Sequence, residues 1–222
     1  MDIMITFKDV KDNEAIKTYI KHADMTLSEL GYTEHSLAHV SKVASVAKYI
    51  LETLNYSERE IELAQIACYL HDIGNVVNRE DHAQSGAVMA FRLLDQMGAE
   101  PWEIAMIIAA IGNHDEKTAV PVSPIAAALI LADKSDVRRS RVRNRDLASF
   151  DIHDRVNYAV EEANIEITNN NTVFSLSLTI DTSISPVMDY FEIFLDRMIL
   201  CKKAASRLGL EFELIINNQK IL

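Results

Sequence analysis

Apolar positions in the first two thirds of the chain follow the spacing of α-helices. In the stretch 36–54 they recur every three or four residues, which places them on one helical face. Ser57 and Glu60 form a capping box, which predicts the start of the next helix. Pro101 and Pro124 each open a segment that is apolar on nearly all sides, as expected of buried helices. Helices are therefore predicted over residues 11–30, 36–54, 57–70, 84–97 and 152–163 and over two segments that begin at Pro101 and Ser123, with Gly74 and Gly98 closing the helices that end near 70 and 97.

The pattern changes after residue 163. Residues 165–168 and 173–180 alternate between apolar and polar side chains on either side of the turn Asn169–Asn171, so this segment predicts a β-hairpin. A long helix is predicted over Pro186–Leu208, and Glu211–Ile216 alternates again as a strand. We therefore expect a mainly α protein, with a helical bundle over residues 1–160 and a small α/β appendage of hairpin, long helix and strand over residues 161–222.

The composition indicates a folded, soluble chain. Of the 222 residues, 49% are hydrophobic and 25% are charged, close to the average of globular proteins. No apolar run approaches the roughly 20 residues of a membrane helix, and the acidic start MDIMITFKDVKDN is unlike a signal peptide. The two cysteines, Cys68 and Cys201, lie in apolar helix-like segments and cannot form a disulfide framework. We therefore expect a cytoplasmic protein that does not associate with membranes.

The charge of the chain argues against a nucleic-acid polymer as its partner. A formal net charge of −11 should repel a phosphate backbone. The basic residues are unevenly spread, since residues 138–145 read RRSRVRNR, with five arginines in eight positions. A local cationic patch on an acidic protein suits a small anion better than a polymer.

Histidine and aspartate residues recur at the ends or inward faces of five consecutive predicted helices. They are His39, the pair His71-Asp72, His82, His114 and Asp133. Any one of the histidines, taken alone, is better explained as a hydrogen-bonded core or surface residue. An ionised carboxylate at the end of an apolar helix, such as Asp133, costs several kcal/mol unless it is paired or metal-bound. Imidazole and carboxylate ligands together suit iron, manganese or zinc, and one carboxylate can bridge two ions, so their joint placement predicts a metal site.

The same residues stand in a recognisable order and sequence context. His39 is followed by the A-x-x-L-H-D-x-G frame of Ala67–Gly74, by His82 in HAQSGA, by His114 in IGNH and by Asp133 in LAD. Over residues 36–145 this set resembles the HD superfamily of metal-dependent phosphohydrolases. The resemblance implies an HD-domain helical bundle with two divalent ions, Fe or Mn rather than Zn or Mg, and a catalytic centre at His71 and Asp72. It further implies that His39, His71, Asp72 and Asp133 hold one ion, and that His82 and His114 hold a second, with Asp72 as the bridge.

Four details qualify the resemblance. Asn75 follows the HDIG sequence, where many relatives have a lysine that could touch a phosphate. The interval of 11 residues from His71 to His82 is shorter than in many dinuclear relatives. No Gly-Tyr-Pro signature is present, so turnover of cyclic di-GMP is not implied. His35 lies one helical turn before His39, where it could be a further ligand, a donor to a ligand or a surface residue.

Hydrolysis of a phosphate ester, from a nucleotide or another small phosphorylated metabolite, is the activity that the resemblance implies. Arg138 and Arg139 follow Asp133 within two helical turns and are predicted to reach a phosphate at the metal ions. The alternative for each arginine is a solvated or salt-bridged side chain on an acidic surface. Further candidates for substrate binding are Arg79, Lys134 and Arg141.

Two other functions stay open at this point. Some proteins of the HD superfamily have a similar ligand set but use two irons to activate dioxygen and cleave a C–C or C–P bond. A metal-stabilised core could also bind nucleotides as a sensor without turnover. The apolar face of the predicted helix 186–208 is expected to pack against the helical domain, with a homodimer interface as its other use.

Overall fold

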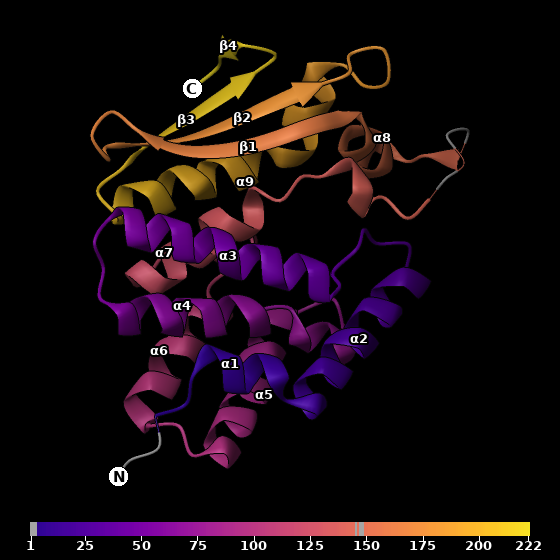
Figure 1. Ribbon diagram of the computed structural model, residues 1–222. Helices are drawn as coiled ribbons and strands as arrows, with labels where there is room; N and C mark the ends of the chain where they lie inside the picture. Colours follow the sequence, from indigo (N-terminus) through magenta and orange to yellow (C-terminus); the bar gives the residue numbers. More distant parts are fainter. Residues whose placement is uncertain (1–3, 145, 147–148) are drawn as a thin grey trace.

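The computed structural model describes residues 4–144, 146 and 149–222, and it consists of a helical layer and a smaller α/β layer (Figure 1). In Figure 1 the helices lie below, the sheet lies at the top, and one long helix, α9, lies between them. The predicted fold class, mainly α with a small C-terminal α/β unit, is confirmed. The helical layer contains α1 (Phe7–Asp12), α2 (Glu14–Glu29), α3 (Leu37–Thr53), α4 (Glu58–Leu70), α5 (His82–Met97), α6 (Pro101–Gly112) and α7 (Pro124–Lys134), with the short 3-10 turns η1 (Ile73–Val76) and η2 (Arg139–Arg141). The α/β layer contains α8 (Ile152–Ala159), β1 (Val160–Thr168), β2 (Val173–Ile180), α9 (Val187–Arg207), β3 (Glu211–Ile216) and β4 (Gln219–Lys220).

Helix α7 forms the centre of the helical layer. Residues 125–132 are each at most 1% exposed, as the all-apolar sequence predicts. The helix starts at Pro124, and the Ser123 hydroxyl accepts a hydrogen bond from the Ala126 N–H. Helices α3, α4, α6 and α9 pack around it, so the main hydrophobic core extends from the helical layer into the α/β layer.

Three of the predicted helices have different boundaries in the structure. The segment 11–30 is two helices, because Asn13 adopts an extended conformation and its side chain caps α2. Helix α5 begins at His82 instead of Gln84, directly after Asp81 with its left-handed φ of 54°. Helix α8 ends at Ala159, because the next residue already belongs to β1 and pairs with β2.

Gly74 does not close a helix, although its position after α4 suggested that it would. It lies in η1, and its φ is not positive. A Cβ on Gly74 would overlap the carbonyl oxygen of His82 and would lie 2.5 Å from the amide nitrogen of Gly86. The absence of a side chain therefore allows η1 and the first turn of α5 to lie backbone against backbone, which brings Asp72 next to His82.

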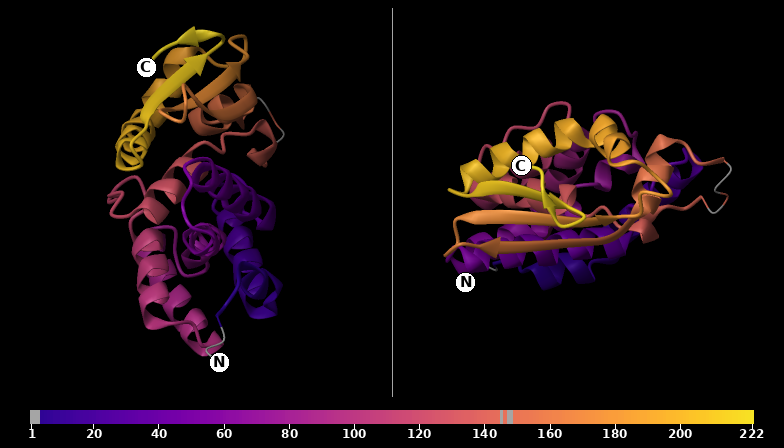
Figure 2. Two further views of the ribbon diagram at one scale, coloured as in Figure 1. Left: turned by 60° about the vertical axis from the view of Figure 1, so that its left-hand side comes forward. Right: turned by 90° about the horizontal axis from the view of Figure 1, so that it is seen from above.

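The sheet has the strand order β1-β2-β3-β4. Strands β1 and β2 form the predicted antiparallel hairpin through Asn169–Asn171, all three of which have positive φ. Strands β2 and β3 are parallel, and α9 makes the crossover between them. Figure 2 shows α9 between the sheet and the helical layer, and its residues Tyr190, Phe194 and Met198 are buried there.

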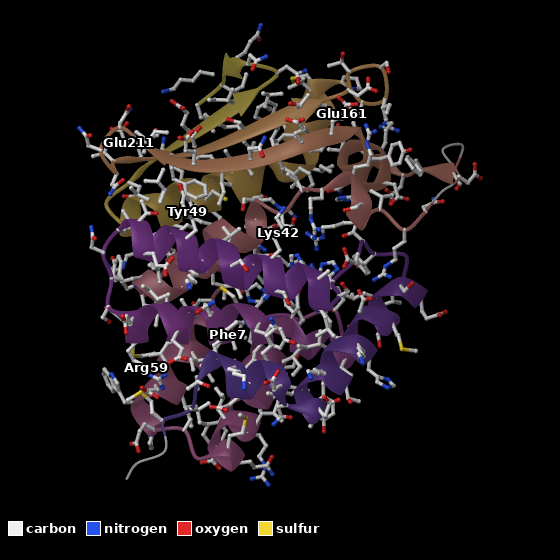
Figure 3. All side chains as sticks on the ribbon, viewed as in Figure 1. Phe7, Lys42, Tyr49, Arg59, Glu161 and Glu211 are labelled. Carbon is white, nitrogen blue, oxygen red and sulfur yellow. The ribbon has the colours of Figure 1, made fainter. Side chains whose placement is uncertain are left out.

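Two hydrogen bonds join the sheet to α3. The Tyr49 hydroxyl, which Figure 3 shows between α3 and the sheet, accepts a bond of 3.1 Å from the backbone N–H of Ile167. The side-chain amide of Asn171 donates to the carbonyl of Thr53 at 2.9 Å.

Helix α8 packs against α9 and β1, so it lies with the α/β layer although it precedes the predicted boundary at residue 160. Among the described residues, no helix is long and apolar enough to cross a bilayer.

Candidate metal centre

The six predicted ligand residues lie together, although they come from five helices or helix ends. His39 Nε2 lies 3.3 Å from Asp133 Oδ1 and 3.7 Å from Asp72 Oδ2. His71 Nε2 lies 3.1 Å from Asp72 Oδ2, and His82 Nε2 lies 3.5 Å from the other oxygen, Oδ1. His82 Nε2 also lies 3.2 Å from His114 Nε2. All four imidazoles are at most 3% exposed, so solvent does not separate these groups.

Each imidazole is held by its Nδ1 atom, which is bonded to an oxygen outside the cluster. Because a carbonyl oxygen can only accept, the Nδ1 atoms of His71, His82 and His114 must donate. A neutral ring that donates through Nδ1 carries a lone pair on Nε2. The Nδ1 partners are Cys68 O at 2.7 Å for His71, Arg79 O at 3.1 Å for His82, Ile111 O at 2.6 Å for His114 and Asp136 Oδ2 at 2.8 Å for His39.

This arrangement points lone pairs at one another inside the protein. The Nε2 atoms of His82 and His114 face each other, and His71 Nε2 faces a carboxylate oxygen. The Nε2 atoms of His39 and His71 are fully buried, and neither has a hydrogen-bond partner. In the neutral rings these nitrogens are buried acceptors without donors, which is costly, and a cation among them, either a metal ion or a proton on His71, removes the cost. The residues present therefore fit a bound metal ion, with the Nδ1 bonds orienting the ligand rings.

Asp72 is shared between two groups of possible ligands. His39, His71 and Asp72 form one group, and Asp72, His82 and His114 form another, each with ligand atoms within 4.8 Å of one another. Oδ2 of Asp72 faces the first pair of histidines and Oδ1 faces His82. A third overlapping group contains His71, His114 and Asp133. The two oxygens of Asp72 thus have the orientation of a bridging carboxylate.

The cluster faces a cavity of about 470 Å³ between the helical layer and the α/β layer. Asp72, His82, His114 and Asp133 line it from the first layer, and α8 and α9 line it from the second. This volume suits a small ligand rather than a polymer. The residues that the α/β layer contributes include Asn157, Ile193, Phe194 and Arg197.

Of the cationic residues predicted to bind substrate, Arg79, Lys134 and Arg141 line this cavity, whereas Arg138 and Arg139 do not. Arg138 forms an ion pair with Asp136, 2.6 Å from Nε to Oδ1, and Arg139 stacks on Tyr158 and lies 3.6 Å from a carboxylate oxygen of Glu161. The expectation for both rested on a helix continuing past Asp133. In the structure α7 ends at Lys134, so helical spacing does not apply to the arginines that follow. Arg197, which was not predicted, also lines the cavity.

The HD domain family matches residues 36–154, more than half of the 222 residues. The chain belongs to the HD domain family. The HD domain contains all six clustered residues, and the predicted membership of this superfamily of metal-dependent phosphohydrolase type is confirmed. The chain is also 23% identical over 183 residues to the Uncharacterized protein MJ1020 of Methanocaldococcus jannaschii, covering 72% of this chain and 70% of that protein.

The charges within the HD domain cluster are strongly coupled. Burial alone would raise the pKa of Asp72, but the neighbouring His71 holds it well below its usual range. Burial would likewise raise the pKa of Asp133, but the positive charge of Lys134 lowers it well below its usual range. Burial would lower the pKa of His71, but Asp72 and Asp133 raise it to about 10. The pKa of His114, in contrast, is lowered by burial and by the charge of His71. Without a metal ion, a proton on His71 therefore balances part of the carboxylate charge.

Metal binding is expected to release a proton and to strengthen with pH. His71 is protonated below its raised pKa of about 10, and only its neutral form can bind a metal ion. Apparent Mn²⁺ affinity should therefore rise by up to about tenfold per pH unit between about pH 6 and 8. Calorimetric titration in buffers of different ionisation enthalpy measures the proton count. Equal affinity across this range, with no proton released, would contradict the prediction.

Asp136 is a functional candidate that the sequence reading did not single out. Its carboxylate accepts from His39 Nδ1, and Lys42 Nζ lies 3.3 Å from Oδ1; Figure 3 shows Lys42 on α3. Burial would raise its pKa, but the bond from His39 and the arginines around it lower it, so it is ionised. The sequence feature that could have indicated a role for Asp136 is its position three residues after Asp133. A buried carboxylate on Nδ1 fixes the ring and makes Nε2 a stronger ligand.

Asp136→Asn should weaken Mn²⁺ binding about 10-fold or more, because the amide keeps the shape of the side chain but loses its charge. Equilibrium metal titration measures the change. Glu161→Gln serves as the control and should leave the affinity unchanged, since Glu161 pairs with Arg139 and neither residue lines the cavity. Wild-type affinity in Asp136→Asn would exclude this role for Asp136.

His35 is half-buried and lines the cavity. Its ring lies edge to face with that of His39, with 5.6 Å between centroids. Its Nδ1 donates to the carbonyl of Thr33 at 2.7 Å. His35 is not a member of the three possible metal-binding groups among the described residues.

Proposed function

We propose that this protein is a metal-dependent phosphohydrolase that cleaves a phosphate ester of a nucleotide or another small phosphorylated metabolite. One observation carries the proposal: the Nε2 atoms of four imidazoles and two carboxylates converge beside a cavity that is also lined by cationic side chains. The HD domain supports the same class of reaction. The cavity volume favours a small substrate.

The proposed site would hold two divalent ions: four imidazoles and two carboxylates suit Fe, Mn or Zn better than Mg, and the resemblance to the HD superfamily favours Fe or Mn. His39, His71, Asp72 and Asp133 would hold one ion. Asp72, His82 and His114 would hold the other. Ions bound in such a set supply Lewis acidity and an activated water for attack on phosphorus. Two divalent ions exceed the charge of the two carboxylates, so the loaded site would attract a phosphate dianion.

Arg79 is the cation that we propose to contact the phosphate. Its guanidinium has no ion-pair partner in the described part of the chain, and it lies 3.5 Å from His82 Nε2. The side chain of Asn75 donates to Asp72 Oδ1 at 2.9 Å and accepts from Arg79 at 3.2 Å. The ring of Tyr32 lies 5.5 Å from the guanidinium carbon. Asn75, which replaces the lysine of many relatives, therefore links Asp72 to an arginine that supplies the cation.

The proposal is tested by assaying phosphate release from nucleoside monophosphates, sugar phosphates and dinucleotides. The protein is stripped of metal, reloaded with Mn²⁺ or Fe²⁺, and assayed under nitrogen and under air. Hydrolysis should proceed equally in both atmospheres and should stop when the metal is removed. Turnover that requires oxygen would favour the di-iron oxygenase instead. Tight nucleotide binding with no product after long incubation would favour the sensor, and either result would contradict the proposal.

A further inference from the structure

A chain of alternating charges connects the metal-binding cluster to α9. Lys134 Nζ lies 2.8 Å from Asp133 Oδ2 and 3.5 Å from Glu116 Oε1. The same Glu116 oxygen accepts a bond of 2.8 Å from Arg197 Nε. Asp133 and Lys134 lie at the end of α7, Glu116 follows His114, and Arg197 lies on α9 of the α/β layer. Two carboxylates and two cations therefore link both layers through one continuous set of ion pairs.

Lys134 determines how the Asp133 carboxylate is oriented. The lysine is 7% exposed, and it occupies Oδ2 of Asp133. The other oxygen, Oδ1, is thereby directed toward His39 at 3.3 Å and His71 at 3.7 Å. One oxygen is paired with the lysine and one is left for a metal ion. This pairing also explains why Lys134 is a poor candidate for binding substrate, although it lines the cavity.

Arg197 holds the outer end of this chain. Its guanidinium carbon lies 4.1 Å from the centre of the Phe194 ring, one helical turn away, and this stacking directs Nε at Glu116. Burial would raise the pKa of Glu116, but Arg197 and Lys134 lower it to about 2. Without Arg197, Lys134 would be the one remaining ion-pair partner of Glu116 among the described residues. The lysine would then be drawn toward Glu116 and away from Asp133.

We propose that Arg197 is a positioning residue for the metal centre: through Glu116 and Lys134 it orients Asp133 for metal binding, so that the α/β layer is part of the site. This inference rests on the proposed metal-dependent function. It assigns to the C-terminal unit a role beyond lining the cavity. It predicts that a residue more than sixty positions after the last ligand controls metal affinity.

The test is a calorimetric Mn²⁺ titration of metal-free protein without substrate, paired with a thermal melt. Arg197→Met should weaken Mn²⁺ binding about 10- to 100-fold, the range typical of residues that support ligands. Arg197→Lys keeps the charge and should restore most of the affinity. Glu116→Gln breaks the chain with little change of shape and should weaken binding in the same direction. In assays of phosphate release, Arg197→Met should lower kcat more than it raises KM.

Arg155→Met is the matched control. Arg155 joins α8 to α9 through Asp189 at 3.0 Å, and neither residue lines the cavity, so its loss should leave Mn²⁺ affinity unchanged. A lower melting temperature of Arg197→Met with wild-type Mn²⁺ affinity would show a purely structural residue and overturn the inference. The same holds if Glu116→Gln binds Mn²⁺ as the wild type does. Wild-type protein that does not bind Mn²⁺ would instead contradict the proposed function itself, and the inference with it.

Discussion

Asp72→Ala is expected to abolish both metal retention and phosphate release. Asp72 is the only residue that presents one oxygen to His39 and His71 and the other to His82 in the described part of the chain. Loss of a supporting residue typically costs 10- to 100-fold in metal affinity, so loss of a bridging ligand should cost more than about 100-fold. Metal analysis of the purified variant and the phosphate-release assay measure the two effects.

Two further variants separate this effect from a folding defect. Asp72→Asn keeps the volume of the side chain and should lose metal and turnover to a similar extent, with a circular dichroism spectrum like that of the wild type. Asp115→Ala removes a carboxylate next to His114 that does not line the cavity, and it should retain both properties. An Asp72→Asn protein that holds two metal ions and remains active would rule out the bridging role.

Gly74→Ala is expected to lower the free energy of unfolding by about 3 kcal/mol, or to prevent folding. The added Cβ would overlap the carbonyl oxygen of His82 and would lie 2.6 Å from Ser85 Oγ. The carbonyl belongs to the helical backbone, so the clash can be relieved only by moving α5 away from η1. That movement would also separate Asp72 from His82, and weaker metal binding should accompany the loss of stability. Chemical denaturation of the metal-free variant measures the change.

Gly112→Ala is the control for this substitution. Gly112 ends α6, and a Cβ there would lie 3.8 Å from the Cβ of Ala87, an ordinary contact. Because alanine is the better helix former, the free energy of unfolding should stay the same or rise by up to about 1 kcal/mol. Equal stability of the Gly74→Ala and Gly112→Ala proteins would show that η1 and α5 can separate at no cost.

The helical layer was largely predictable because local signals agree with the packing. The capping box of Ser57 and Glu60 is present at the start of α4, and Pro124 opens α7 as predicted. The errors lie at two single residues whose roles depend on more than helical periodicity. Asn13 divides one predicted helix into two, and Gly74 serves a close approach of two segments instead of a helix end. Neither distinction can be made from periodicity, which does not describe contacts between distant segments.

Convergence of the six clustered residues was predictable because each lies at a fixed place relative to a strongly patterned helix. The positions of the residues around this cluster were not predictable. Arg138 and Arg139 were expected at the cavity on the assumption of helical spacing, but the chain leaves α7 at Lys134 and follows an irregular path. Glu116 and Arg197 are 81 positions apart and meet only through the packing of α9 on the helical layer. Contacts of this kind have no signal in a single sequence.

The cavity receives its two walls from separate stretches of the chain. All six clustered residues precede residue 134, whereas Asn157, Ile193 and Phe194 follow residue 150. Substitutions in the later stretch can therefore alter which molecules fit the cavity without changing the six clustered residues. Arg197 is the exception, since it belongs to the later stretch but is bonded to the earlier one. Divergence within the family could thus vary selectivity freely at Ile193 while Arg197 stays constrained.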